Sequence, residues 1–216
     1  MKIKNLLFDF DGTLFDTGEG IIKSVQYSAR SFGFIEDNPE DLRSFVGPPL
    51  LDSFMNRYSI DEETGRKMIS KFRERYGTLG INECKPYSDI FECIKELKSH
   101  GINILIATGK PTVHAKTILD NFDYTDLFDD ILGSDLEGKL TQKKDIIAAL
   151  IRKWGSDGSV MIGDRDNDVL GALANNLPCL GVAWGYAKEG ELKKAGALEI
   201  FETPKALLYY LLSSKN

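Results

Sequence analysis

The sequence predicts an α/β protein with a doubly wound parallel sheet and a helical segment inserted after the first strand. Short apolar runs, typical of buried strands, alternate with stretches of helical periodicity. Several runs are rich in Ile or Val and end at Gly, Thr or Asp. The five expected strands are Ile3–Phe8, Ile102–Ala107, Ile131–Leu132, Val160–Ile162 and Leu180–Ala183. In such a sheet ligands bind beyond the carboxyl ends of the strands, so polar residues there are the first functional candidates.

The pattern changes after the first strand, where helical spacing dominates and no strand is expected. Asn38-Pro39 is typical of a helix start, and Asp61–Tyr76 has the apolar spacing of an amphipathic helix. We therefore expect a Rossmann-like core domain of residues 1–17 and 86–216 and an inserted helical cap domain of residues 18–85. An insertion at this point can close over a site at the strand ends.

The composition argues against several kinds of partner and location. The 216 residues carry a formal net charge of −6, whereas binding to a phosphate backbone normally requires a basic surplus, so nucleic acid is not expected. No apolar stretch reaches membrane-spanning length, and the N-terminal apolar run ends at Asp9, too early for a signal peptide. The three cysteines are scattered, which indicates a reduced, cytoplasmic location. With two histidines a His-rich zinc site is not expected, and the oligomeric state is not predicted.

Two carboxylates follow the first expected strand, in Asp9-Phe10-Asp11-Gly12-Thr13. Like charges in a poorly solvated position raise one another's pKa, and a divalent cation is one way to compensate them. Asp9 and Asp11 are two residues apart, so in an extended segment both side chains face the same side. Gly12 lets the backbone turn tightly. Taken alone, this segment is equally consistent with a solvated turn and with a metal site.

A second acidic cluster, Gly163-Asp164-Arg165-Asp166-Asn167-Asp168, follows the strand expected at Val160–Ile162. Its spacing lacks the remaining ligands and the terminal Glu of an EF-hand calcium loop. Because the carboxyl ends of parallel strands meet at one edge of the sheet, we expect the two acidic clusters to converge. Three or four carboxylates without His or Cys suit Mg²⁺, a hard ion that prefers oxygen ligands.

Two further segments can supply groups that bind an anion. Ala107-Thr108-Gly109-Lys110 places a hydroxyl and backbone N–H groups at an expected strand end and helix start, although Thr-Gly is common there. Lys143 and Lys144 lead into a helical run. Lysines at such a position are normally solvated, so neither is assigned a function from its position alone.

These motifs, in this order, resemble those of the haloacid dehalogenase-like hydrolase superfamily. The set is Asp-x-Asp-Gly-Thr, then Thr, then Lys, then Gly-Asp-x-x-x-Asp, and the resemblance covers nearly the whole chain. The opening segment Phe8–Thr17 and the helical insertion are similar to the phosphoglycolate phosphatase-like branch, which has a helical type 1 cap. The resemblance implies a phosphatase that uses Mg²⁺ and acts on a small phosphorylated metabolite.

The resemblance also implies a role for each motif residue. Asp9 is implied as the nucleophile and Asp11 as the general acid/base, while Thr108 and a lysine bind the phosphoryl group. For the lysine we expect Lys143, with Lys144 as the alternative. The implied metal residues are Asp9, Asp11 through its backbone carbonyl, Asp164, and Asp168 as support.

Residues near the substrate are implied in both parts of the chain. In the core they are Gly12, Thr13 and Gly109. In the cap, the loop Phe45-Val46-Gly47-Pro48-Pro49 resembles the Gly-Pro-containing specificity loop of the family, which makes Gly47 and Pro48 candidates. A plain connector between two helices, with proline at a helix start, explains the same segment equally well.

Two departures from the branch leave the substrate open. The lysine segment Leu140–Asp145 lacks the prolines common in the branch, and Arg165 stands where Ser or Thr often follows the metal Asp. Both features resemble a bacterial subgroup labelled phosphoglycolate phosphatase or 5′-nucleotidase.

The expected function is Mg²⁺-dependent hydrolysis of a small, phosphoglycolate-like phosphate monoester through an aspartyl-phosphate. One alternative is a 5′-nucleotidase acting on nucleoside monophosphates, since Phe45 can stack on a base. The others are a phosphomutase resembling β-phosphoglucomutase and a non-catalytic phosphate-binding module. The acidic residue at Asp11 argues against a dehalogenase or a phosphonatase.

Overall fold

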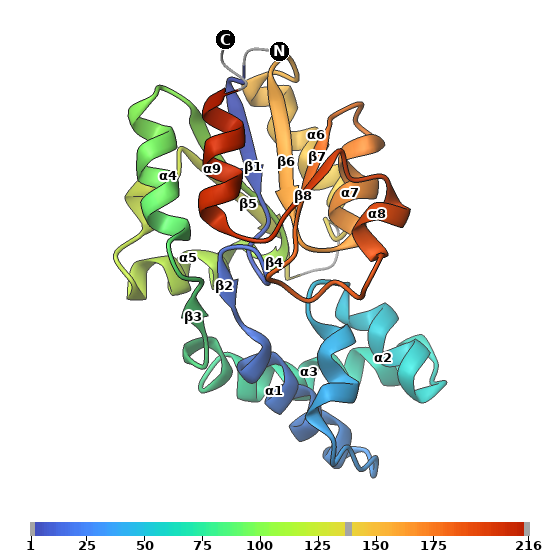
Figure 1. Ribbon diagram of the computed structural model, residues 1–216. Helices are drawn as coiled ribbons and strands as arrows, with labels where there is room; N and C mark the ends of the chain where they lie inside the picture. Colours follow the sequence, from blue (N-terminus) through green and yellow to red (C-terminus); the bar gives the residue numbers. More distant parts are fainter. Residues whose placement is uncertain (1–2, 137–139, 214–216) are drawn as a thin grey trace.

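The computed structural model describes residues 3–136 and 140–213. In these residues a six-stranded sheet has the order β5-β4-β1-β6-β7-β8, and all its pairs are parallel (Figure 1). The strands are β1 (Asn5–Phe8), β4 (Asn103–Pro111), β5 (Asp130–Ser134), β6 (Ser159–Gly163), β7 (Cys179–Val182) and β8 (Glu199–Phe201). Because β1 pairs with both β4 and β6, these three strands lie side by side in the middle of the sheet.

Helices cover both faces of the sheet. They are α4 (Ile90–Ser99), α5 (Thr112–Asn121), α6 (Lys143–Trp154), α7 (Asp166–Leu173), α8 (Glu191–Ala195) and α9 (Pro204–Ser213). Successive side chains of a strand point to opposite faces. Accordingly Leu6 and Phe8 pack in one buried cluster with α4, α5 and α9, and Leu7 packs in another with α6, α7 and α8. Both faces of β1 are thus apolar at Leu6–Phe8, which explains the unbroken apolar run of these three residues.

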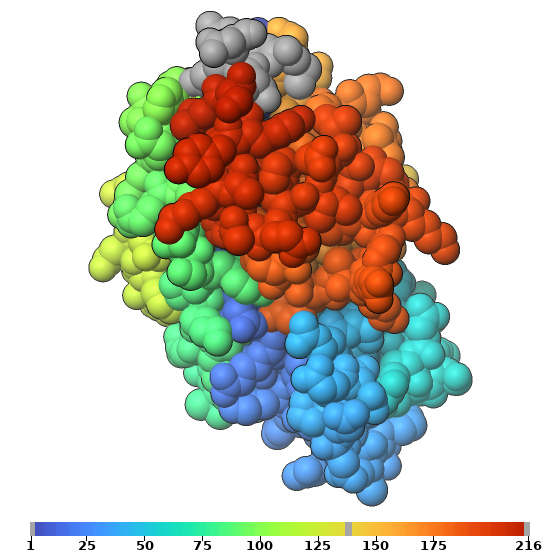
Figure 2. All heavy atoms as spheres, in the orientation of Figure 1, coloured from blue at the N-terminus to red at the C-terminus, as the bar shows by residue number. Residues whose placement is uncertain are grey.

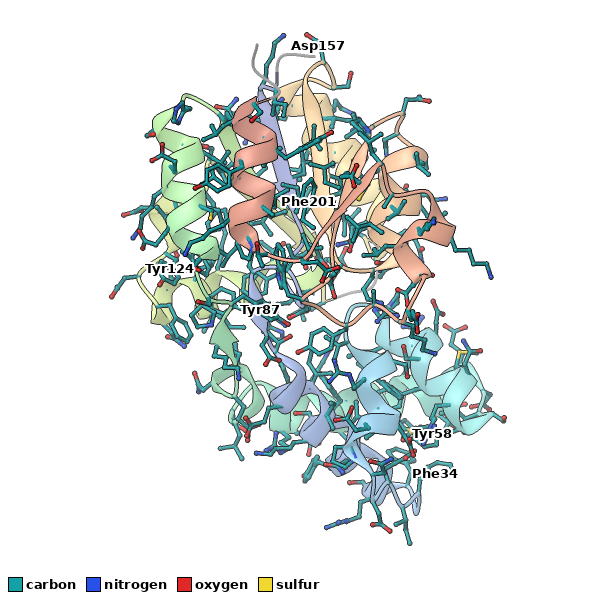
Figure 3. The ribbon with its side chains drawn as sticks, in the orientation of Figure 1. Phe34, Tyr58, Tyr87, Tyr124, Asp157 and Phe201 are labelled. Carbon is teal, nitrogen blue, oxygen red and sulfur yellow. The ribbon has the colours of Figure 1, made fainter. Side chains whose placement is uncertain are left out.

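A helical part lies beyond the carboxyl ends of the strands and forms the lower lobe in Figure 2. It consists of α1 (Gly18–Ser31), α2 (Leu50–Tyr58), α3 (Glu62–Tyr76) and two short 3₁₀ helices at Pro39–Phe45 and Gly80–Asn82. Its interior is apolar, with Val25, Phe54 and Met68 fully buried. At its far end Phe34 and Tyr58 stack with ring centroids 4.4 Å apart (Figure 3).

A two-stranded antiparallel ribbon joins the helical part to the core. It pairs β2 (Phe15–Asp16), just before α1, with β3 (Lys85–Pro86), just before α4. We keep the division into a core of 1–17 and 86–216 and a cap of 18–85 as a proposal, because α1 begins at Gly18 and the second boundary falls within β3. Residues 1–2, 137–139 and 214–216 of the expected core lie outside the described residues.

The expected fold class is confirmed, and each of the five expected strands is present. One strand end is corrected, because β4 continues beyond Ala107 to Pro111. Strand β8 and the β2–β3 ribbon were not expected, since segments of two or three residues are too short to show a strand period. None of the helices in the described part of the chain has the length and apolarity needed to cross a membrane.

Candidate active site

The central strands bring the two acidic segments together. Asp9 directly follows β1 and Asp164 directly follows β6. These strands pair in register, with Phe8 opposite Ile162, and the Asp9 backbone N–H donates to the Ile162 carbonyl at 2.9 Å. The convergence expected from the sequence therefore occurs at one edge of the sheet.

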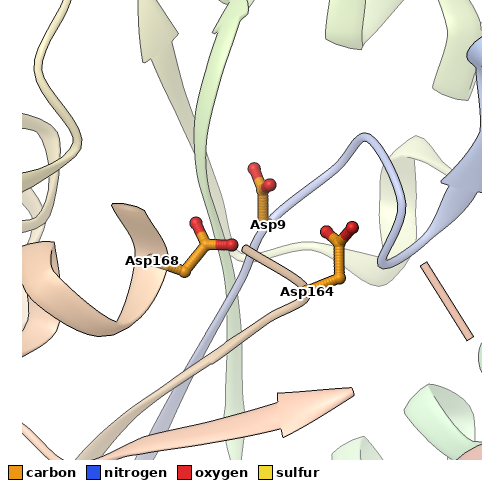
Figure 4. A group of neighbouring side chains, drawn as sticks. All are labelled: Asp9, Asp164 and Asp168. Atoms are coloured by element: carbon orange, nitrogen blue, oxygen red, sulfur yellow. The ribbon is translucent and has the colours of Figure 1, made fainter. Parts of the chain in front are cut away.

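Asp9, Asp164 and Asp168 form a buried cluster in which one carboxylate oxygen of each lies within 4.8 Å of the others (Figure 4). Their exposed fractions are 3%, 0% and 0%. Burial, followed by repulsion from Asp168 and Asp9, raises the pKa of Asp164 well above its usual value. Burial and Asp9 likewise raise the pKa of Asp168, against the opposing effect of Lys143. Ionising all three carboxylates together is therefore unfavourable unless positive charge compensates them.

Hydrogen bonds hold the Asp164 carboxylate in place. It accepts from the Tyr186 backbone N–H at 2.7 Å and from the Thr13 hydroxyl at 3.1 Å. Gly12 passes so close that a Cβ there would lie 2.1 Å from Asp164 Oδ2, and its φ of +85° also favours glycine. Gly12 and Thr13, expected near the substrate, thus contact Asp164.

This cluster fits a hard divalent cation. All three side chains offer oxygen ligands, which Mg²⁺ prefers, and a Mg²⁺ ion would offset the repulsion that raises the pKa values of Asp164 and Asp168. The Asp168 carboxylate is oriented by the Arg165 backbone N–H, which donates to Oδ2 at 3.1 Å. A metal here would be held by Asp9 and Asp164, with Asp168 beside them.

Lys143, at the start of α6, points its ammonium into the acidic cluster. Its Nζ lies 2.7 Å from Asp9 Oδ1 and 2.7 Å from Asp168 Oδ1, and it donates to the Ala107 carbonyl at 3.0 Å. Burial by itself would lower the pKa of Lys143, but the Asp168 and Asp9 carboxylates outweigh it and raise the pKa. The neighbouring Lys144 is exposed. Of the two candidate lysines, the fold therefore directs Lys143 to the carboxylates.

The Asp11 carboxylate lies outside the three-carboxylate cluster. It accepts from Lys110 Nζ at 2.8 and 3.1 Å and from the Thr17 hydroxyl at 2.7 Å. All three residues are buried. The two carboxylates of the first motif are therefore separated: Asp9 faces Lys143 and Asp168, and Asp11 faces Lys110 and Thr17.

Lys110 was not assigned from the sequence, because β4 was expected to end at Ala107. The strand runs to Pro111 and α5 begins at Thr112, so the helix start expected at Thr108-Gly109 is wrong. Thr108 is 1% exposed, and its hydroxyl accepts a hydrogen bond from the Lys110 backbone N–H at 3.2 Å. In an extended segment, side chains two residues apart lie on the same face. The position of Lys110 two residues after Thr108 is therefore the sequence signal that could have identified it.

A cavity of about 530 Å³ opens between the core and the helical part. The expected residues Asp11, Gly109, Lys143, Gly47 and Pro48 line it. Its helical side adds apolar and aromatic residues, among them Phe45, Leu50, Ile69, Phe72 and Tyr76. Such a mixture of a few polar groups on an apolar wall is typical of a site for a small molecule.

Two aromatic residues on the cavity wall were also not expected there. Tyr76 of α3 is 2% exposed, and its ring lies 5.0 Å from Lys110 Nζ and 5.4 Å from the His114 ring. The Tyr76 ring thus stabilises the Lys110 ammonium through a cation–π contact. Burial, then Lys110 and Arg73, lowers the pKa of His114 to about 4, so this imidazole is neutral at pH 7. Sequence periodicity alone places both residues on helix faces without showing what they meet.

Known proteins match this chain over most of its length. A family model described as haloacid dehalogenase-like hydrolase matches residues 6–182. The 5′-nucleotidase of Pseudomonas aeruginosa is 38% identical over 195 residues, covering 89% of this chain and 88% of that protein. The phosphoglycolate phosphatase of Psychrobacter arcticus is 28% identical over 223 residues, covering 97% of this chain and 96% of that protein.

Solved structures agree with these relatives. The crystal structure of a predicted phosphatase from Clostridium acetobutylicum matches with a TM-score of 0.96 at 43% identity, covering 99% of this chain and all of that one. The expected resemblance and the expected phosphatase class are therefore confirmed. With the family model matching most of its length, the chain belongs to the haloacid dehalogenase-like hydrolase family.

Proposed function

We propose that this hydrolase is a Mg²⁺-dependent phosphatase that cleaves a small phosphate monoester through an aspartyl-phosphate on Asp9. The observation that carries the proposal is the contact of Lys143 with both Asp9 and Asp168, inside a buried cluster of three carboxylates. A phosphate dianion repels a carboxylate nucleophile, so the site needs positive charge close to the attacking oxygen. Lys143 supplies one such charge at 2.7 Å from Asp9 Oδ1.

Mg²⁺, held by Asp9, the Asp11 carbonyl and Asp164 with support from Asp168, would add Lewis-acid neutralisation of the phosphoryl oxygens. Asp9 attacks phosphorus, and the bond from phosphorus to the ester oxygen breaks. Asp11 in its protonated form gives its proton to the departing oxygen, which leaves as the alcohol. The ionised Asp11 then takes a proton from the water that attacks the aspartyl-phosphate, and inorganic phosphate is released.

Contacts within the chain support the separate roles of the two aspartates. Lys143 fixes one oxygen of Asp9, whereas Thr17 and Lys110 hold Asp11 at the border of the cavity, where a leaving group must lie. Gly109, which lines the cavity, and Thr108 just before it on β4 are proposed to contact the phosphoryl oxygens. Gly12 and Thr13 are proposed to support the site through Asp164.

The cavity favours a nucleoside monophosphate over phosphoglycolate as the substrate. A volume of about 530 Å³ is in the range of cavities that enclose a drug-sized molecule, and glycolate would fill only a small part of it. Phe45, Phe72 and Tyr76 offer aromatic surface for a base. The 38% identical 5′-nucleotidase supports the same choice. The location is proposed to be cytoplasmic, since Cys84, Cys93 and Cys179 are free thiols, and nucleic acid is not proposed as a partner.

The test is a phosphate-release screen over phosphoglycolate, sugar phosphates and nucleoside monophosphates, with Mg²⁺ or with EDTA. We expect Mg²⁺-dependent release with the highest kcat/KM for a nucleoside monophosphate, and background release from the Asp9→Asn variant. Equal activity in EDTA, or full activity of Asp9→Asn, contradicts the proposal. Conversion of a sugar 1-phosphate to a 6-phosphate would identify a phosphomutase, and binding without turnover would identify a phosphate-binding module.

A further inference from the structure

The side chain of Arg165 connects the core to the helical part. Arg165 follows Asp164 at the start of α7 and is 7% exposed. Its Nη1 donates to the Val46 carbonyl at 2.6 Å, and its Nε donates to Glu191 Oε1 at 2.8 Å. Val46 lies in the loop before α2, and Glu191 begins α8. One guanidinium therefore bridges two parts of the chain that are far apart in sequence.

The core holds this guanidinium firmly. Glu191 accepts two further hydrogen bonds, from the backbone N–H groups of Asp166 and Lys188, each at 3.1 Å. Side-chain exposures of 9% for Arg165 and 13% for Glu191 place the pair largely out of water. Removing one member of such a pair leaves the other charge buried and unpaired, which is unfavourable. The position of the Arg165 guanidinium therefore depends on Glu191.

The cap loop Val46–Pro49 rests directly on two core segments. A Cβ at Gly47 would lie 3.1 Å from Arg165 Cγ, and a Cβ at Gly109 would lie 3.2 Å from the Gly47 carbonyl oxygen. Gly47 also has a φ of +103°, which favours glycine. Because Gly47 and the prolines after it line the cavity, the position of this loop determines how closely the cavity wall can enclose a leaving group.

We propose that Arg165 is a positioning residue that holds the cap loop over the cavity and thereby sets affinity for large leaving groups. The same residue donates its backbone N–H to Asp168 Oδ2 at 3.1 Å, so the loop that carries the metal carboxylates also fixes the cap. The kinetic consequence rests on the proposed phosphatase function, whereas the docking of the loop does not. This assigns a use to the arginine that stands where the family often has Ser or Thr.

Two measurements on Arg165→Ser and Arg165→Lys test the inference. Hydrogen–deuterium exchange over residues 43–54 reports the docking of the loop without any substrate. Steady-state kinetics compare adenosine 5′-monophosphate with acetyl phosphate, whose leaving group is small. The control is Arg57→Lys, which alters a cap arginine paired with Glu36 at 2.7 Å. Thermal unfolding of each variant checks that it folds. If Arg165→Ser does not fold, Arg165→Lys, which keeps the positive charge, is used for the test.

We expect hydrogen–deuterium exchange over residues 43–54 to be faster than in the parent in both Arg165 variants. In the Arg57→Lys control the exchange should be unchanged. We also expect KM for adenosine 5′-monophosphate to rise about tenfold, the effect of one lost charge-assisted hydrogen bond. The kcat for this substrate and the kinetics with acetyl phosphate should change by less than about twofold.

Unchanged exchange together with unchanged KM overturns the inference. Equal losses on both substrates, with weaker Mg²⁺ dependence, also overturn it, because they show that Arg165 serves only the metal loop. If the parent protein releases no phosphate from any substrate, the proposed function fails and the exchange data alone decide whether the loop is docked by Arg165.

Discussion

At the scale of the residue, adjacent lysines have opposite surroundings. Lys143 Nζ contacts Asp9 and Asp168, whereas Lys144 is exposed one position later on the same helix. Lys143→Met should lower kcat by at least about 10²-fold, because a preorganised charge near the phosphoryl group is removed. Lys144→Met is the matched control and should retain most activity. Comparable losses in the two variants, measured as initial rates of phosphate release, would contradict the assignment.

His114 gives a prediction for the pH dependence of stability. Its pKa is lowered to about 4 from 6.5, so the unfolded chain takes up a proton at His114 at a higher pH than the folded chain. Stability is therefore lost as pH falls from about 6.5 towards 4. After allowance for partial exposure, we expect a loss of about 1 kcal/mol between pH 7 and pH 5.

Urea unfolding at both pH values measures this loss. His114→Asn should show a smaller fall than the parent. His100→Asn, at the exposed residue that follows α4, tests whether the loss of any histidine has this effect. A fall as large in His114→Asn as in the parent would exclude His114 as the cause.

The residues of the site differ in how well the sequence predicts their positions. Asp9, Asp164 and Asp168 follow strands that the apolar pattern defines, so their convergence was predictable from the parallel topology. The position of Lys110 follows from the end of β4. The pairing register of β4 shifts between Ala107 and Pro111, so the apolar pattern does not show where this strand ends. Tyr76 reaches the site only through tertiary packing of the cap, which no local pattern encodes.

At the scale of the element, the junction between the β2–β3 ribbon and α1 depends on one hydroxyl. The Tyr186 hydroxyl accepts from the Gly18 backbone N–H at 2.8 Å and donates to the Asp16 carboxylate. Gly18 is close enough to need the absence of a side chain, since a Cβ would lie 2.7 Å from that oxygen. The long sequence separation of Tyr186 from Gly18 explains why the sequence did not reveal this contact.

Tyr186→Phe should lower the free energy of unfolding by about 1–2 kcal/mol, because the Gly18 N–H and the Asp16 carboxylate each lose their shortest hydrogen bond and keep only longer contacts. Tyr209→Phe removes a hydroxyl from a residue that is 70% exposed and serves as the control. Denaturant midpoints measure both. A shift no larger in Tyr186→Phe than in Tyr209→Phe would show that the hydroxyl does not stabilise the junction.

At the scale of the whole molecule, the proposed magnesium site predicts that metal binding stabilises the fold. Without a cation, Asp9, Asp164 and Asp168 repel one another. The Lys143 ammonium contacts Asp9 and Asp168 and offsets part of this repulsion. At Mg²⁺ concentrations about 100 times the Kd, binding stabilises the folded state by about 2.7 kcal/mol, which corresponds to a Tm increase of roughly 5–10 °C.

Differential scanning calorimetry with Mg²⁺ and with EDTA measures this increase. Asp164→Asn should abolish most of the response, whereas Asp157→Asn, at the end of the molecule away from the cap, should preserve it (Figure 3). A Tm that does not respond to Mg²⁺ in the parent protein would contradict a magnesium site in the cluster.

The β2–β3 ribbon has a consequence for how such a protein can change. The chain leaves the core at Phe15–Asp16 and returns beside it at Lys85–Pro86, so both covalent connections to the helical part lie in this one ribbon. The strands that carry Asp9 and Asp164 make their sheet hydrogen bonds without it. A different helical module with the same two ends would therefore leave the proposed phosphoryl-transfer groups in place, so substrate range and reaction chemistry could evolve independently.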